Sequence, residues 1–528
     1  MKKSPVVLIA FEEFDNLGTG YLASVLSDAG FDSLVIDVRI DKEKILENLL
    51  NANPFIVGFS VIFEFYIYAF ANLISYLRKR GVACHFTAGG QYASLRYKEL
   101  FEIIPELDSI VRFEGEYTFL ELVKSIHSGD DLRNLKSIVY KKEGNLVTTP
   151  LRPLEDNLDN FPFPMRSPLK EYVFNKKFAT ILAGRGCIYN CVYCNTKKFF
   201  QLPPGPVKRL REPEMVVREM ELLYHEKQCS IFLFQDDDFP VKTRNGNDWI
   251  SRFCFEIKQK KLNNKIMWKI NCRPDEISHD SFALMKNNGL FLVFIGIEDG
   301  TDYGLKLLKK HMTVAKSLKG INTLKKLGIG FDFGFMLFQP DSTFDSVLEN
   351  LNFLKKIFSD GYSPVTFLKM LPFFETEIEI KLKKEGRLTG KPGFLDYSFL
   401  DETLDLYYGF FEKSFLDWTR GDEGLLNISR WARNNISVFS FYHKATPDLS
   451  LISEHIKSVV SKSNLFLLET MMELADIFKS GKHDSVRNKD LIRFRKTINA
   501  KHDQFREEIN ESIDNLYRYA EFQMYFQL

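Results

Sequence analysis

Three cysteines in one short loop are the residues of this 528-residue chain best suited to chemistry. Cys187, Cys191 and Cys194 have the spacing C-x3-C-x2-C, which lets three thiolates surround one compact centre. Soft thiolates select zinc or iron–sulfur clusters. A closed zinc site needs a fourth ligand, but His225 and Cys229 follow only after a predicted helix. Three ligands leave one iron with an open position, where a small molecule can coordinate and receive an electron.

The other cysteines indicate the compartment. The chain has seven cysteines, an odd number, and the four outside the loop are scattered. This usage is not typical of a disulfide framework, and Cys84, Cys229 and Cys254 lie next to apolar residues, as small core side chains do. The apolar stretch near the N-terminus is too short for a signal peptide. We therefore expect a reducing compartment, the cytoplasm.

Short apolar stretches that alternate with helical patterns surround the cysteine loop. Strands are expected at residues 179–183, 231–234, 267–271, 292–297, 329–337 and 366–371. Helices are expected at residues 212–225, 248–259, 281–287, 315–327 and 343–358. Six strand–helix units predict a partial (β/α)6 TIM-like barrel, with its chemistry at the carboxyl ends of the strands.

A second alternating series precedes the barrel. Its strands are expected at residues 6–10, 33–37, 55–60, 83–88 and 110–113, with helices between them. This order predicts parallel βαβ units in a flavodoxin-like, doubly wound domain, whose ligand lies beyond the carboxyl ends of the strands. Residues 55–77 hold a single charge, Glu64, and are also long enough for a membrane span. A buried strand that runs into a buried helix explains this segment equally well.

The chain is predicted to be an α/β protein with three folded parts. Residues 1–145 form the doubly wound domain, residues 146–170 a proline-rich linker, residues 171–394 the barrel and residues 395–528 a mostly helical domain. The 71 Lys and Arg residues balance 70 Asp and Glu residues. This balance gives no general affinity for nucleic acid or an anionic membrane, so we expect neither as a partner.

The cysteine loop resembles that of the radical S-adenosylmethionine (SAM) superfamily. The resemblance is carried by the C-x3-C-x2-C spacing, by Gly184 and Gly186 before it, and by the aromatic Tyr193 before the third cysteine. It implies a [4Fe-4S] cluster on the three cysteines, with the open iron binding the amino and carboxylate groups of SAM. It also implies that Tyr193 packs near the adenine and that SAM is cleaved to a 5′-deoxyadenosyl radical.

Other barrel segments resemble elements of the same superfamily that hold SAM. Asp236 and Asp237 end the second strand, where the family binds the ammonium group, although a solvated loop or a divalent-metal site remains an alternative. Asn271 and Arg273 resemble the element near the ribose and carboxylate, and Glu298 matches a polar contact in a Gly-x-Glu element. The resemblance implies that these five residues bind cofactor.

The N-terminal segments resemble the cobalamin-binding domain that is often fused ahead of radical enzymes. Glycines at strand ends let the backbone approach a bulky corrin and its nucleotide tail. The alternative is a degenerate domain that serves only as a scaffold. The cofactor-binding residues implied by the resemblance are Asn16, Leu17, Gly18, Ser60, Gly89, Gly90, Gln91, Glu114, Gly115 and Glu116.

One departure from other cobalamin proteins is informative. The Asp-x-His-x-x-Gly element that supplies a lower cobalt ligand is missing, and the first histidine of the chain is His85. Any cobalamin is therefore expected to lack histidine from that motif below cobalt. This matches the radical-enzyme subgroup.

The resemblances together imply a cobalamin-dependent radical SAM enzyme that methylates an unactivated carbon of a small molecule or natural product. One alternative is a cobalamin-dependent radical SAM enzyme that closes or rearranges a ring without methyl transfer. Another is a non-catalytic iron–sulfur electron carrier or scaffold. The expected cofactors are a [4Fe-4S] cluster, SAM and cobalamin. The expected partners are a small-molecule substrate and an external electron donor such as flavodoxin or ferredoxin.

Overall fold

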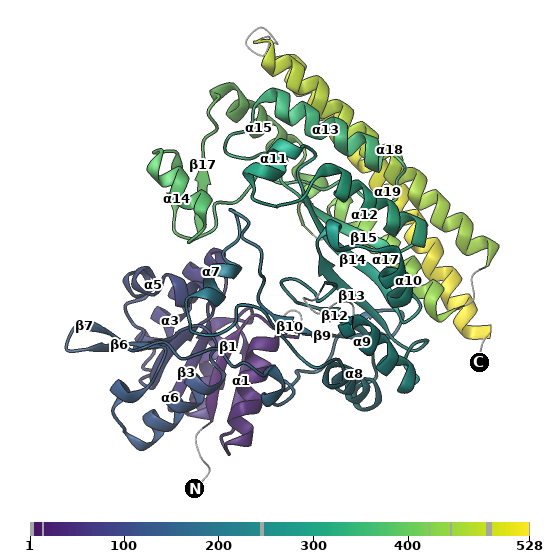
Figure 1. Cartoon of the computed structure of the whole chain (residues 1–528). Helices are drawn as coiled ribbons and strands as arrows, with labels where there is room; N and C mark the ends of the chain where they lie inside the picture. The colour runs from purple at the N-terminus through teal and green to yellow at the C-terminus, as the bar shows by residue number, and fades with distance from the viewer. Residues whose placement is uncertain are drawn as a thin grey trace.

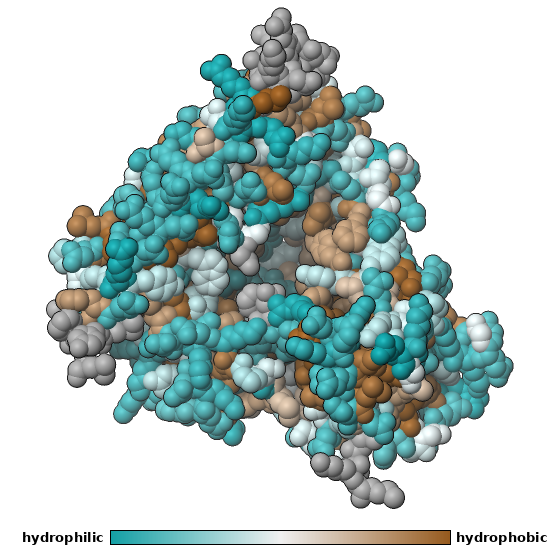
Figure 2. Space-filling view, turned by 180° about the vertical axis from the view of Figure 1, so that it is seen from behind, coloured by the Kyte–Doolittle hydropathy of each residue, from teal (hydrophilic) through white to brown (hydrophobic). Residues whose placement is uncertain are grey.

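The computed structural model describes residues 5–12, 15–242, 248–421, 423–443, 446–481 and 488–526. An N-terminal α/β domain lies beside a second sheet, and long C-terminal helices cover the far side of that sheet (Figure 1). The opposite face of the molecule is hollowed at its centre, between the N-terminal domain and the rest of the chain (Figure 2).

The N-terminal sheet has the strand order β2-β1-β3-β4-β5-β6-β7. Strands β1 to β5 are parallel, whereas β6 and β7 add an antiparallel hairpin at one edge. The order reverses between β1 and β3, which opens a crevice beyond the carboxyl ends of these strands. The strands are β1 (Val6–Ala10), β2 (Ser33–Asp37), β3 (Ile56–Ser60), β4 (His85–Gly89), β5 (Ser109–Val111), β6 (Ile138–Lys142) and β7 (Asn145–Thr148).

Helices cover both faces of this sheet and bury two apolar cores. One core holds Leu26 of α1 and Leu122 of α6, and the other holds Leu46 of α2, Phe70 of α3 and Phe101 of α5. The predicted flavodoxin-like domain is therefore present. The helices are α1 (Leu17–Asp28), α2 (Lys42–Ala52), α3 (Ile67–Lys79), α4 (Gln91–Leu95), α5 (Tyr97–Ile103) and α6 (Glu116–Ser128).

The apolar segment at residues 55–77 divides between β3 and α3. Helix α3 buries Ile67, Phe70, Ile74 and Leu77, which recur at the spacing of one helix face. This packing follows the strand-to-helix interpretation. Within the described ranges, no helix combines the length and the hydrophobicity needed to cross a membrane.

The second sheet has the order β15-β14-β13-β12-β9-β8, and all its strands except the edge strand β8 are parallel. A single parallel bridge between Phe338 and Lys369 takes the place of a sixth barrel strand. The strand expected at residues 366–371 does not extend further, since Pro364 and Pro372 flank it and lack the N–H that a ladder needs. The strands are β8 (Glu171–Val173), β9 (Lys176–Ile181), β12 (Cys229–Phe234), β13 (Met267–Cys272), β14 (Leu290–Glu298) and β15 (Gly330–Phe335).

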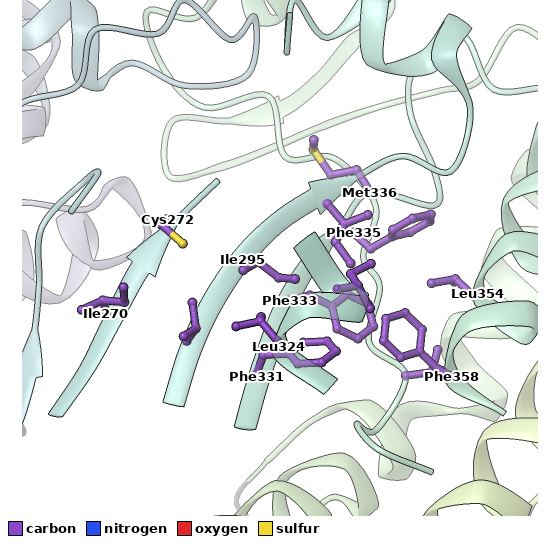
Figure 3. Close-up of a cluster of buried hydrophobic side chains, with 14 of the residues drawn as sticks. Ile270, Cys272, Ile295, Leu324, Phe331, Phe333, Phe335, Met336, Leu354 and Phe358 are labelled. Atoms are coloured by element: carbon purple, nitrogen blue, oxygen red, sulfur yellow. The ribbon is translucent and has the colours of Figure 1, made fainter. Parts of the chain in front are cut away.

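Alternate residues of the barrel strands face the helices and the lumen. Figure 3 shows Phe331, Phe333 and Phe335 of β15 directed toward the outer helices, where Phe333 stacks on Phe358 at 4.2 Å between ring centroids. Asp332, between them in the sequence, faces the lumen side instead. The outer helices are α8 (Pro213–Lys227), α9 (Asp248–Gln259), α10 (His279–Lys286), α11 (Asp302–Leu307), α12 (Val314–Leu327) and α13 (Phe344–Phe358).

Residues after the barrel form a hairpin and a set of helices. One long helix spans Pro447–Lys479, and in its middle the Asn464 side chain accepts a hydrogen bond from the Val365 N–H and donates one to the Phe358 carbonyl. Helices α18 and α19 lie side by side along the barrel (Figure 1). The elements are α14 (Glu377–Lys384), β16 (Leu388–Lys391), β17 (Phe394–Tyr397), α15 (Glu402–Ser414), α16 (Leu416–Thr419), α17 (Leu425–Tyr442), α18 (Pro447–Lys479) and α19 (Asn488–Phe526).

Short elements complete the connections around the cysteine loop. Strands β10 and β11 pair as a two-stranded sheet on either side of that loop and of helix α7. Single 3-10 turns occur in both α/β parts and in the linker. These elements are β10 (Gly184–Arg185), α7 (Thr196–Gln201), β11 (Arg209–Leu210), η1 (Glu64–Tyr66), η2 (Leu132–Asn134), η3 (Leu158–Asn160) and η4 (Pro274–Glu276).

Candidate functional site

The cysteine loop, residues 187–194, leaves the carboxyl end of β9 through β10 and leads into α7. Backbone contacts shape it: the Cys194 N–H donates to the Cys191 carbonyl at 3.2 Å, and the Val192 N–H donates to the Leu308 carbonyl at 3.2 Å. Gly186 has φ +83°, and a Cβ there would overlap the Val207 carbonyl. Only glycine therefore fits before the first cysteine.

The three sulfurs lie at the predicted place, beyond a barrel strand. Cys187 and Cys191 are half-buried and Cys194 is exposed, whereas Cys229 and Cys254 are buried in the core. Within the described ranges, no three His, Cys, Asp or Glu side chains lie close enough together to hold a metal ion. The assignment of the three cysteines as ligands therefore rests on their thiolate chemistry and on their loop.

Two carboxylates at the end of β12 reach the backbone of this loop. Asp236 Oδ2 accepts a hydrogen bond from the Ala183 N–H at 3.0 Å, and Asp237 Oδ2 accepts one from the Gly186 N–H at 3.2 Å. Asp236 is 2% exposed, and its Oδ1 has no hydrogen-bond partner among the described residues. Burial raises the pKa of Asp236 to about 7. A buried, half-satisfied carboxylate fits a cationic ligand group better than a solvated loop.

A buried lysine joins two of the predicted residues. Lys310 Nζ lies 3.0 Å from Glu298 Oε1 and donates a hydrogen bond to the Tyr193 hydroxyl at 3.2 Å. Glu298 has φ +67°, a strained conformation for a non-glycine residue that often marks a functional site. Burial alone would lower the pKa of Lys310, but the charges of Glu298 and Cys191 and the hydrogen bond to Glu298 together outweigh burial and raise that pKa. Lys310 was not predicted, because only the folded chain brings its ammonium group to Glu298 and Tyr193.

Asn271 and Arg273, at the end of β13, take different positions. The Asn271 amide donates to the Asp236 carbonyl at 3.2 Å, which holds the ends of β12 and β13 together. The Arg273 guanidinium lies 3.9 Å from the centre of the Tyr189 ring and donates to the Lys310 carbonyl at 2.6 Å. The structure thus brings the predicted barrel residues to one rim, around the cysteine loop.

A cavity of about 320 Å³ lies between the N-terminal domain and this rim, and we call it the interdomain cavity. The barrel contributes Arg185, Phe200 and Asp237 to its wall. Gly90 has φ +108°, and a Cβ there would lie 2.7 Å from the Val61 carbonyl oxygen, so glycine is required. The predicted residues that line this cavity are Leu17, Gly18, Ser60, Gly89, Gly90, Glu114, Gly115 and Glu116.

Two other predicted residues make structural contacts instead of lining the interdomain cavity. The Asn16 side chain accepts a hydrogen bond from the Thr19 N–H at 3.2 Å and so caps α1. The Gln91 amide donates to Asn195 Oδ1 at 2.9 Å and links the N-terminal domain to the end of the cysteine loop. His85 bonds to Ser109 at 2.8 Å and is not among the residues that line the cavity.

The carboxylates of Glu114 and Glu116 pair with barrel arginines. Arg185 contacts Glu114 at 3.0 Å and Glu116 at 2.6 Å, and Arg209 contacts Glu114 at 2.8 Å. Burial would raise the pKa of Glu114, but hydrogen bonds from Arg209 and the charge of Arg185 outweigh it and lower that pKa. Phe113, just before this segment, has φ +64°. These pairs fix the two domains against each other at the edge of the cavity.

Two family profiles match the two α/β parts of the chain. Residues 4–123 match the B12 binding domain, and residues 181–354 match the Radical SAM superfamily. An uncharacterized methyltransferase of Pyrococcus horikoshii is 28% identical over 366 residues, which are 67% of this chain and 76% of that protein. The anaerobic magnesium-protoporphyrin IX monomethyl ester cyclase of Rubrivivax gelatinosus is 25% identical over 422 residues, 75% of this chain and 74% of that protein.

A solved structure shares the architecture. The cobalamin-dependent S-adenosylmethionine radical enzyme OxsB, with aqua-cobalamin and S-adenosylmethionine bound, superposes with a TM-score of 0.66. The superposition covers 95% of this chain and 84% of that chain at 17% sequence identity, and so shows a common fold. The predicted fold class is confirmed. The two profiles confirm the predicted domain types and the predicted cofactors, which are a [4Fe-4S] cluster, SAM and cobalamin.

Proposed function

Because the chain combines a B12 binding domain with a radical SAM domain, it belongs to the cobalamin-dependent radical SAM enzymes, and we propose that it methylates a carbon atom of a small molecule. The observation that supports this proposal is the interdomain cavity. Residues of the N-terminal domain and the barrel line it together, and Arg185 of its wall stands two residues before Cys187. A ligand in this cavity therefore borders the cysteine loop.

The residues present fit the three cofactors. Cys187, Cys191 and Cys194 supply soft thiolates for a cluster with one open iron. We propose that the buried Asp236 binds the ammonium group of SAM, because its Oδ1 has no hydrogen-bond partner among the described residues. The interdomain cavity is mostly apolar, with glycine backbone in its wall, as a corrin and its tail require.

The protein residues position these groups and keep water out. When bound, the cluster and SAM supply a 5′-deoxyadenosyl radical, and cobalamin supplies the methyl group. The Lys310–Glu298 pair holds the Tyr193 ring in place, where it can pack against the adenine. Phe113 and Phe200 form apolar walls of the interdomain cavity, which shield a radical from solvent.

The proposed partners follow from the reaction. The substrate is a small molecule, since the space next to the cysteine loop is a cavity of about 320 Å³ lined by residues of both domains. An external one-electron donor such as flavodoxin or ferredoxin reduces the cluster.

Labelled SAM tests the proposed methyl transfer. The anaerobically reconstituted protein is incubated with a reductant, methyl-labelled SAM and the small-molecule fraction of a cell extract. We expect 5′-deoxyadenosine together with a labelled small-molecule product. Formation of 5′-deoxyadenosine without any labelled product would contradict methyl transfer.

Ring formation or rearrangement without methyl transfer is the second candidate. The similarity to a cyclase over 75% of this chain favours it. The same incubation separates the two reactions, because a cyclase consumes its substrate and forms 5′-deoxyadenosine but leaves the label out of the product. A product that carries the label excludes this candidate.

A further inference from the structure

A second cavity, of about 990 Å³, extends into the barrel lumen, and we call it the lumen cavity. Its walls come from three parts of the chain: the inner face of the barrel sheet, the loops after β1 and β3, and helix α17. Leu17, Ile62 and Gln235 line both this cavity and the interdomain cavity. The two spaces therefore share a wall at the carboxyl end of β12.

Cationic side chains outnumber carboxylates around Asp332, although over the whole wall of the lumen cavity the three acidic side chains balance the three basic ones. Arg433 already forms an ion pair with Asp332, with Nη2 at 2.6 Å from Asp332 Oδ1. Its guanidinium also donates a hydrogen bond to the Phe331 carbonyl. Arg430 Nε lies 3.7 Å from the same oxygen and has no hydrogen-bond partner among the described residues. The Nζ of Lys269, from the middle of β13, makes no hydrogen bond or ion pair within 4.0 Å with any residue that the structure describes, although Lys269 lies close enough to Asp332 to feel its charge. Three cations thus share one carboxylate.

The surroundings of Lys269 and Arg430 make this excess charge costly. Burial lowers the pKa of Lys269, and the Asp332 carboxylate offsets it only in part. Burial likewise lowers the pKa of Arg430; the Asp332 carboxylate opposes this shift in part, and the neighbouring Arg433 adds to it. An additional anion would compensate both side chains.

Aromatic and aliphatic residues form the remaining wall. The rings of Tyr172 and Trp431 lie 5.2 Å apart, and Phe178, Leu233 and Leu292 complete the apolar surface. Trp431 is 44% exposed and stands on α17, at the side of the cavity that the C-terminal domain provides. The lumen cavity therefore combines an end where cations outnumber carboxylates with an apolar wall.

We propose that the lumen cavity binds an amphipathic small-molecule substrate whose anionic group, a carboxylate or a phosphate, lies between Lys269 and Arg430. This inference deepens the proposed function and rests on it, because it names the chemical class of the substrate. The apolar part of the substrate packs against Tyr172 and Trp431. Its reacting carbon points toward Gln235, where the lumen cavity meets the interdomain cavity.

Binding of small anionic probes tests this inference without any turnover. The full-length protein, loaded with cluster and cobalamin, is titrated calorimetrically with phenyl phosphate, phenylacetate, and the neutral phenylacetamide and benzyl alcohol. We expect at least one anion to bind at least tenfold more tightly than its neutral counterpart. The stronger of the two anions identifies phosphate or carboxylate. Equal affinity for charged and neutral probes, or no saturable binding of either anion, would overturn the proposal.

Variants then locate the bound anion. Lys269→Met and Arg430→Met are each expected to weaken anion binding at least tenfold, whereas Lys269→Arg keeps the charge and most of the affinity. Lys265→Met, just before β13 and outside the cavity, is the matched control and should bind as the wild type does. Undiminished binding in both methionine variants would overturn the assignment. A protein that shows this binding but forms no methylated product contradicts the proposed function alone.

Discussion

The fold of the cysteine loop does not depend on its sulfur atoms. Backbone hydrogen bonds at Val192 and Cys194 hold the loop, and none of them needs a side-chain sulfur. Replacing Cys191 by alanine should therefore remove a cluster ligand and leave the chain folded. We expect Cys191→Ala to lose its cluster and to form no 5′-deoxyadenosine, as measured by iron and sulfide content and by product analysis. The control Cys254→Ala, in the core, should keep the cluster and should still form 5′-deoxyadenosine. A Cys191→Ala protein that still cleaves SAM would refute the cluster assignment.

The buried Asp236 makes the stability of the unloaded protein depend on pH. The pKa of Asp236 is about 7 in the folded chain, against 3.8 when the side chain is not buried, as in the unfolded chain. Between these pH values the folded state keeps a proton that the unfolded state releases. Stability is therefore lost as the pH rises from about 4 to about 7, with a slope of at most about 1.4 kcal/mol per pH unit. Asp236→Asn cannot ionise and should not show this loss.

Denaturant unfolding of the wild type and of Asp236→Asn across this pH range measures the effect. As the pH rises to about 7, the free energy of unfolding of the wild type should fall relative to that of Asp236→Asn. Above about pH 7 the difference between the two proteins should stay constant. Parallel curves for the two proteins would show that Asp236 ionises normally. In that case the carboxylate would not be poised to receive the ammonium group of a ligand.

At the scale of the element, the turn after β4 determines whether the interdomain cavity can form. Gly90 has φ +108° and ψ 179°, which is accessible in practice only to glycine, and its missing Cβ leaves room for the Val61 carbonyl. We expect Gly90→Ala to lower stability markedly and to abolish cobalamin binding, measured by absorbance after gel filtration. Gly81→Ala is the matched control, because Gly81 also has a positive φ of +86° but has open space around it. Gly81→Ala should cost about 1–2 kcal/mol and retain cobalamin. Equal cobalamin binding by both variants would show that the turn does not shape the site.

Most elements were predictable because their hydrophobic periodicity is local. The strand–helix alternation placed the parallel strands of both sheets, and α9 was predicted at residues 248–259, its bounds in the structure. The hairpin of β6 and β7 was not predicted, since β7 is largely exposed and lacks an apolar pattern.

The candidate site was predictable only where the sequence carries local spacing. The cysteines stand within eight residues, and the acidic pair ends a recognisable strand. Lys310, Arg185 and Arg209 were not found, because each meets its carboxylate partner only in the folded chain. Lys269 was not predicted either, because Asp332 and Arg430, which line the lumen cavity with it, lie far from it in the sequence.

At the scale of the whole molecule, buried ion pairs hold the N-terminal domain against the barrel. Arg96 pairs with Glu379, Arg185 with Glu116, and Arg166 with both Asp15 and Glu219. The cavities proposed for cobalamin and substrate lie between these domains, so their shape depends on this interface. Loss of one central cation should therefore affect both stability and binding.

Arg166 tests this dependence most directly. It stands in the linker, its side chain is 5% exposed, and it joins Asp15 of the N-terminal domain to Glu219 of α8. In Arg166→Met the two buried carboxylates lose a shared cation, although Arg211 still contacts Glu219 at 2.6 Å. We expect a loss of about 3–5 kcal/mol, a clear fall in Tm, and faster proteolysis within residues 146–170.

The matched control is Arg133→Met, because Arg133 pairs with Asp131 on the surface and is 66% exposed. Its Tm and proteolysis should match the wild type, since water screens such a pair. The double variant Arg166→Met/Asp15→Asn should recover part of the lost stability, because it also removes one of the carboxylates left without its cation. If Arg166→Met melts with the control and resists protease equally, the domains are held by apolar packing and the cavities between them do not depend on this ion pair.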